Sequence, residues 1–77
     1  MSRDYFAHVA GFDQGLGLVC CGTTPREAAL DRIRNFHGPE RIVVSVYERG
    51  DVIRKGGALL GSWKFLRTKE GDWREYL

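Results

Sequence analysis

Apolar and polar residues alternate in short runs along most of this chain of 77 residues, a pattern typical of a half-buried β-sheet. The first run, DYFAHVAGF, puts Tyr5, Ala7 and Val9 on one face of a strand, and its other face also carries apolar residues. Asp-Gln-Gly then forms a turn, and LGLVCCG follows as a second strand. The pattern predicts a β-hairpin over residues 5–22 that is partly buried on both faces.

One run, TTPREAALDRIRNFHGP, has helical spacing instead. Thr24 can cap a helix, Pro25 suits its first position, and Glu27 completes a capping box with Thr24. The Gly-Pro pair at 38–39 would stop this helix. The sequence therefore predicts a helix over residues 25–37 that packs one apolar stripe on the sheet, made of Ala29, Leu30, Ile33 and Phe36.

Further strands are predicted in the second half of the chain. RIVVSVYE is the third strand and should be the best buried, and a turn at ERGD leads into a short fourth strand, VIRK. GGALLG fits either a bend or bulge or the start of a strand. SWKFLRT and DWREYL are the fifth and sixth strands, and a turn at KEG joins them.

This order of elements predicts one α+β domain over residues 1–77. Its single helix packs on a mostly antiparallel sheet of four to six strands, in the order strand-strand-helix-strand-strand-strand-strand. Short hairpin connections need no parallel crossovers. Because one helix covers only one face of a sheet, we expect the other face to be at least partly open.

The turn of the C-terminal hairpin decides which side chains share a face. A two-residue turn would place Arg67 opposite Arg74, a destabilising pair of like charges. We therefore predict a three-residue turn that ends in Gly71. This register pairs Arg67 with Trp73, Phe65 with Glu75 and Lys64 with Tyr76.

The same register lines up Trp63, Phe65, Arg67 and Trp73 on one face, and two interpretations of this face are open. An exposed face would stack nucleic-acid bases or partner side chains, at about 1–3 kcal/mol per stacked base. Alternatively, the rings close the core under the helix and the basic residues lie at solvated edges. Because a small domain needs its large aromatics inside, the second interpretation is favoured, with Trp73 or Tyr76 left exposed.

Charge and hydropathy bear on whether the protein binds nucleic acid or a membrane. The net charge is +2, and the excess of basic residues lies in residues 41–77, which hold eight basic and five acidic side chains. This balance is too weak to indicate nucleic acid by itself. No apolar run approaches the ~20 residues that cross a bilayer, and the N-terminus lacks the pattern of a signal peptide. We expect a cytoplasmic protein with no membrane partner.

The sequence offers little catalytic chemistry. Cys20 and Cys21 are adjacent, so on a strand they point to opposite faces and form no ordinary disulfide with each other. One of these cysteines, together with His8 on the paired strand, forms the only candidate pair of a nucleophile and a base in the sequence. His37 would cap the helix C-terminus. The sequence has no phosphate loop, paired acid and base, or metal-ligand spacing, so we expect no enzyme, no cofactor and no metal.

Two resemblances bear on function. GTTPREAALDRIRNF after a hairpin is similar to the start of HicB-type antitoxins, at Gly22, Thr24, Glu27, Ala28 and Leu30, although the Pro-Asp-Leu-Pro-Gly turn of that family is absent. In size and layout the chain resembles small phage-encoded inhibitors such as anti-CRISPR proteins. This second resemblance implies a helix on a bent antiparallel sheet that occupies a surface on a nucleic-acid machine.

The resulting hypothesis is a small non-enzymatic protein-binding module, a phage-type inhibitor that occupies a surface on a bacterial nucleoprotein complex. The alternative is direct binding of single-stranded nucleic acid by the C-terminal aromatic and basic strands. A thiol-dependent enzyme comes third, and a homodimer could form through an unpaired edge strand. The predicted partner-binding residues are Arg54, Lys55, Trp63, Lys64, Phe65, Arg67, Trp73 and Arg74.

Overall fold

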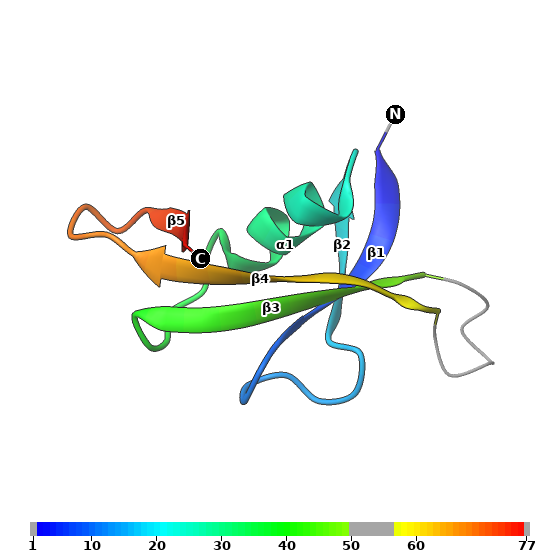
Figure 1. Ribbon diagram of the computed structural model, residues 1–77, viewed down its shortest axis with the longest axis horizontal. Coiled ribbons are helices and arrows are strands. Elements are labelled where there is room, and N and C mark those ends of the chain that lie inside the picture. Colours follow the sequence, from blue (N-terminus) through cyan, green and yellow to red (C-terminus); the bar gives the residue numbers. More distant parts are fainter. Residues whose placement is uncertain (1, 50–56, 77) are drawn as a thin grey trace.

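The computed structural model describes residues 2–49 and 57–76, which form one helix against one five-stranded sheet (Figure 1). The elements are β1 Arg3–Val9, β2 Leu18–Gly22, α1 Pro25–Ile33, β3 Arg41–Glu48, β4 Leu59–Arg67 and β5 Trp73–Tyr76. The strands lie in the order β2-β1-β3-β4-β5, and every neighbouring pair is antiparallel. The predicted α+β class is confirmed, while the predicted strand VIRK lies outside the described residues.

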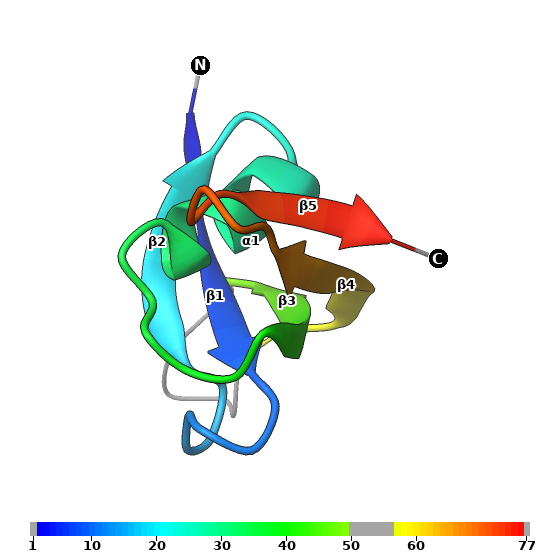
Figure 2. The same cartoon turned by 90° about the vertical axis from the view of Figure 1, so that its left-hand side faces the viewer.

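The helix covers one face of the sheet. Figure 2 shows that the sheet curves around α1, so that β2 and β5 flank the helix. The core lies between α1 and this concave face and consists of Tyr5, Ala7, Val9, Cys20, Ala28, Ala29, Ile33, Ile42, Val44, Val46 and Phe65. The opposite, convex face carries no helix among the described residues, and we call it the open face.

The N-terminal hairpin is confirmed, with Tyr5 of β1 opposite Cys20 of β2. Its strands are shorter than predicted, because β1 ends at Val9 rather than Phe12 and β2 begins at Leu18 rather than Leu16. Gly17 enters β2 with a φ of 86°, and a Cβ at this position would lie 2.1 Å from the carbonyl oxygen of Ala7. Both the backbone conformation and the close approach require glycine here. The Tyr5 alternation predicted for β1 is confirmed, because Tyr5 and Val9 both enter the core.

The start of α1 agrees with the capping prediction. The Thr24 hydroxyl accepts a hydrogen bond from the N–H of Glu27 at 3.2 Å. In return the Glu27 carboxylate accepts from the N–H of Thr23 at 2.7 Å, one residue before the cap. These bonds satisfy backbone donors that the first helical turn leaves unpaired.

The end of α1 differs from the prediction. The helix ends at Ile33 rather than at residue 37, because the chain tightens into a turn in which the Phe36 N–H donates to the Ile33 carbonyl at 2.9 Å. The Phe36 ring then packs edge-on against Phe12 at 5.3 Å between centroids. His37 lies beyond the helix, so its predicted role as a helix cap is wrong.

The chain enters β4 through a bulge. Val46 of β3 lies opposite Gly61, whereas the next residue, Tyr47, lies opposite Leu59, so β4 carries one extra residue at this point. GGALLG therefore contains both the start of a strand and a bulge, the two possibilities that its sequence left open.

An ion pair joins the loop between β1 and β2 to α1. The Asp13 carboxylate accepts two hydrogen bonds from Arg32, at 2.9 and 2.6 Å, and one from the Val9 N–H at 2.8 Å. Burial raises the pKa of Asp13, but these hydrogen bonds and the Arg32 charge outweigh it and hold this pKa below its usual 3.8. The stabilisation is therefore complete above pH 4 and is lost as the pH falls through the folded-state pKa.

We expect Asp13→Ala to lower the free energy of unfolding at pH 7 by about 3 kcal/mol, because it leaves a largely buried guanidinium without its partner. The variant should also lose less stability than the wild type between pH 4 and pH 2. Urea unfolding at pH 7, pH 4 and pH 2 measures both effects. The double variant Asp13→Ala/Arg32→Met is the control, and it should recover part of the loss; equal stability of the single and double variants would contradict the assignment.

Candidate partner-binding surface

The C-terminal hairpin has the predicted register. Its pairs are Lys64 with Tyr76, Phe65 with Glu75, Leu66 with Arg74, and Arg67 with Trp73. The turn is closed by the Thr68 N–H, which donates to the Asp72 carbonyl at 2.7 Å, and Gly71 has a φ of 92°. The three-residue turn that ends in Gly71 is confirmed.

The predicted binding residues divide between the two faces of the sheet, because successive strand residues point to opposite sides. Trp63, Phe65, Arg67 and Trp73 lie on the helix side, as the register implied, and Lys64 and Arg74 lie on the open face. Arg54 and Lys55 lie outside the described residues. The six described residues therefore do not form one surface.

The aromatic residues on the helix side belong to the core or its border. Phe65 is fully buried, so its predicted role as a partner anchor is wrong and the core interpretation holds for it. Trp63 and Trp73 are half-buried and pack against the core. The Trp63 ring covers Gly61, where a Cβ would lie 2.7 Å from the indole. These rings close the core and offer no open stacking platform.

Arg67 also has a structural partner. Its guanidinium lies 5.4 Å from the centroid of the Trp73 ring and donates a hydrogen bond to the carbonyl of Gly38. The side chain thus connects the terminal hairpin to the loop that follows α1. A cation held over an aromatic ring in this way contributes roughly 0.5–1 kcal/mol.

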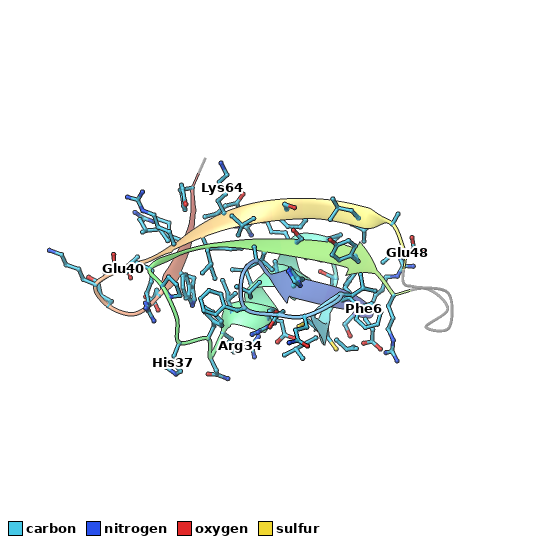
Figure 3. The ribbon with its side chains drawn as sticks, turned by 90° about the horizontal axis from the view of Figure 1, so that it is seen from below. Phe6, Arg34, His37, Glu40, Glu48 and Lys64 are labelled. Carbon is cyan, nitrogen blue, oxygen red and sulfur yellow. The ribbon has the colours of Figure 1, made fainter. Side chains whose placement is uncertain are left out.

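The open face is organised in rows that cross the strands, about 7 Å apart along each strand. Figure 3 labels Phe6, which belongs to the first of these rows, and Lys64, which belongs to the third. The apolar row contains Val19, Phe6, Tyr47 and Leu59, the polar row contains His8, Ser45 and Ser62, and the two remaining rows contain Val43, Lys64 and Tyr76, then Arg41, Leu66 and Arg74.

The apolar row spans four strands. Phe6 and Tyr47 lie opposite each other on the central strands β1 and β3, and both are half-buried. Val19 and Leu59 at the two ends of the row are 48% and 55% exposed. In the neighbouring polar row the hydroxyl oxygens of Ser45 and Ser62 are 2.9 Å apart. The row is a contiguous apolar strip beside small polar residues.

The opposite end of the open face is basic. Arg41, Lys64 and Arg74, together with Tyr76, form what we call the basic cluster, and the Arg41 guanidinium lies 6.0 Å from the centroid of the Tyr76 ring. In residues 2–49 and 57–76, none of these three cations has an acidic partner. The acidic side chains Asp4, Asp13, Asp31 and Glu75 are each paired with another arginine.

Sequence reasoning missed the apolar row and Arg41. The sequence contains a signal for them, because these residues alternate along β1 and β3 with the core residues Tyr5, Ala7 and Ile42. Alternation separates two faces without saying which face the helix covers. The aromatic residues of the C-terminal hairpin were predicted to bind a partner, but they lie on the helix side and are wholly or partly buried.

The thiol and histidine arrangement considered from the sequence is wrong. β1 and β2 pair from Arg3 to Ala7, so His8 has no cysteine opposite it and faces Ser45 instead. Cys20 is in the core, and burial raises its pKa to about 11. The exposed Cys21 donates a hydrogen bond to Asp4 at 3.2 Å, which raises its pKa as well. Both shifts disfavour the nucleophilic thiolate.

In the described part of the chain, no cluster of three histidine, cysteine or acidic residues could hold a metal ion. No helix among these residues has the length and apolar character needed to cross a membrane. Comparisons with protein-family models, with curated proteins and with solved structures gave no match to this chain.

The division between the faces can be tested with two neighbouring residues. We expect Phe65→Ala to lower the free energy of unfolding by about 3–5 kcal/mol, because it opens a cavity in the core. Lys64→Ala, one residue away on the open face, should change it by less than about 0.5 kcal/mol. Urea unfolding of both variants measures the contrast, and comparable losses would contradict the assigned faces.

Proposed function

We propose that this chain is a non-enzymatic module that binds a partner protein through its open face. The observation that carries the proposal is the apolar row of Val19, Phe6, Tyr47 and Leu59, which crosses four strands on the side of the sheet opposite α1. Contiguous exposed apolar side chains are costly in water and mark interaction surfaces.

The surroundings of this row fit a protein interface. Such interfaces have an apolar, aromatic centre and a polar rim with charges at the periphery. Here Phe6 and Tyr47 are central, the serines flank them, and the basic cluster lies beyond. Two aromatic rings on paired central strands are held by the sheet, so their immobilisation on binding costs little conformational entropy.

We further propose that the module is a phage-type inhibitor that acts in the bacterial cytoplasm and occupies a surface on a nucleic-acid machine. The basic cluster supports this assignment, because proteins that handle nucleic acids can expose acidic groups that hold cations, and a cluster of basic side chains is complementary to such groups. Three cations at the end of the open face opposite the apolar row would orient the module on an acidic surface and raise its association rate. A convex face also fits into a concave partner site.

A second candidate function is direct binding of single-stranded nucleic acid. One observation favours it: Tyr76 lies beside Arg41 and Lys64, in the combination of ring and cations that supports stacked bases and phosphates. The ligand would then lie on the basic cluster rather than on the apolar row.

The test of the primary proposal uses two leucines that are equally exposed. Leu59 lies in the apolar row and Leu18 lies outside it, and each is 55% exposed. We expect Leu59→Ser to weaken partner binding at least about tenfold, the effect of roughly 1.4 kcal/mol, and Leu18→Ser to leave it unchanged. Tagged protein captures the partner from nuclease-treated bacterial lysate, and titration of the purified partner gives the affinity. Equal affinities for Leu59→Ser and the wild type would contradict the proposal.

Salt dependence separates the two candidate functions. Phosphate contacts release counterions, so affinity for a single strand falls with a log–log slope of about −0.7 per contact. We expect the complex with the partner protein to show a shallow slope, because its centre is apolar. A steep slope that becomes shallower in Lys64→Ala/Arg74→Ala would instead identify nucleic acid as the ligand.

A further inference from the structure

Among the described residues, one segment of the sheet edge next to the C-terminal hairpin has no neighbouring strand. β5 pairs only with residues Lys64–Arg67 of β4, whereas β4 begins at Leu59. Residues 59–63 extend past the end of β5 on the same side. No strand in the described part of the chain pairs with them there.

The backbone groups of this segment have a defined direction. The Arg67 N–H donates to Glu40, next to β3, at 2.8 Å, and the Thr68 N–H donates to Asp72, next to β5, at 2.7 Å. Along a strand, the N–H and C=O groups of successive residues point alternately to its two sides. The even-numbered residues of β4 therefore direct these groups toward the side on which β5 lies. Ser62 is the first such residue beyond Lys64, the last residue of β4 with a partner in β5.

Leu60 extends the row of outward groups. Gly61 lies opposite Val46 of β3, so its two neighbours in β4 point away from β3. Leu60 and Ser62 together present two N–H donors and two C=O acceptors along the edge. The bulge at Leu59–Leu60 ends the regular segment, so the edge has room for a short added strand only.

The other outer edge of the sheet, formed by β2, is partly covered. The Cys21 N–H of β2 donates to the Asp31 carboxylate of α1 at 3.1 Å, and the helix packs alongside this strand. Folded proteins cover edges in this way to prevent unwanted pairing. The open segment of β4 has no such cover from the described residues, and its Leu59 and Leu60 side chains are exposed.

The surroundings of the edge indicate the chemistry of an occupant. A hollow of about 250 Å³ is lined by Ser62, Trp63, Lys64, Glu75 and Tyr76. Glu75 is paired with Arg26 at 2.5 Å, so among the described residues that line this hollow Lys64 is the charged side chain without an ion-pair partner. An extended backbone matches the row of donors and acceptors, and an acidic side chain matches Lys64.

We propose that residues Leu60–Ser62 of β4 accept a short, extended, acidic segment of a partner protein as an added strand in line with β5. Backbone hydrogen bonds then supply affinity, while the hollow and Lys64 select the side chain. That a partner protein exists rests on the function proposed above, but the backbone groups of Leu60–Ser62 are distinct from the side chains of the apolar row, so the two proposals can fail separately.

Hydrogen exchange in the free protein is the first arm of the test. We expect the amides of Leu60 and Ser62 to exchange quickly, and those of Gly61 and Trp63, which face β3, to be protected. Slow exchange at Leu60 and Ser62 would show that the edge is already covered and would overturn the proposal. Protection that rises with protein concentration would identify a second copy of the chain as the occupant and would overturn it too.

The second arm uses a probe peptide of alternating valine and glutamate, Val-Glu-Val-Glu-Val, followed by NMR titration. Binding should slow exchange at Leu60 and Ser62, and a peptide N-methylated at alternate residues, which cannot pair along one edge, should bind at least about tenfold more weakly. A lysine-containing peptide, Val-Lys-Val-Lys-Val, controls for charge. Equal binding of the methylated peptide would overturn strand addition.

A matched pair of variants completes the test. Ser62→Pro removes the outward N–H, a change that an edge strand tolerates, and Ser62→Ala removes the same hydroxyl but keeps the N–H. We expect only Ser62→Pro to lose peptide binding, and equal affinities would contradict the proposal. If Ser62→Pro does not fold, the difference in affinity between the N-methylated and unmethylated peptides still tests strand addition. Loss of partner binding in Leu59→Ser with normal partner binding in Ser62→Pro would leave the apolar row as the site and refute the edge.

Discussion

The close packing of α1 on the concave face of the sheet is the constraint on which the rest of the structure depends. Ala28 and Ala29 are fully buried, and a Cβ at Gly22 of β2 would lie 2.7 Å from the backbone nitrogen of Ala28. Small residues on both elements therefore let helix and sheet approach closely. A helix of nine residues then fills the concave side, and the chain has no other helix among its described residues to cover the convex side.

This constraint explains how charge is distributed over the molecule. Arg32 and Arg26 of α1 reach the loop at Asp13 and the strand at Glu75, so acidic groups near the helix are neutralised where they hold elements together. The pair between Arg32 and Asp13 is largely shielded from water and fixes the position of the helix relative to the first hairpin. Within residues 2–49 and 57–76, Arg41, Lys64 and Arg74 on the open face form no such ion pair.

Local rules predicted much of the fold from the sequence. The β3 strand has the predicted bounds, the capping signals at Thr24 mark the start of α1, and the repulsion between Arg67 and Arg74 gave the register of the last hairpin. Each of these depends on neighbours in the chain or on one cross-strand pair. Such interactions can be recognised from the spacing of residues alone.

The site could be predicted only in part, because its composition depends on tertiary packing. The alternation of residues predicted which side chains share a face of the sheet with Phe65. The position of α1 determines that this face is the buried one. The end of α1 has the same cause, since Phe36 leaves the helix to pack between Phe12 and Trp73, which are distant in sequence. Lys64 and Arg74 are exposed, as predicted, because long charged side chains are seldom fully buried.

The open face and the open edge meet at one corner of the sheet, around Ser62, Lys64 and Tyr76. A strand added along β4 would enlarge the sheet sideways and carry its own side chains onto the convex face next to the polar row. Strand addition alone fixes direction and register but selects weakly among sequences, because every backbone offers the same groups. An apolar strip alone selects by shape but leaves orientation free. A partner that uses both surfaces would be held in one orientation by the edge and recognised by the face, so the small size of the module need not limit its specificity.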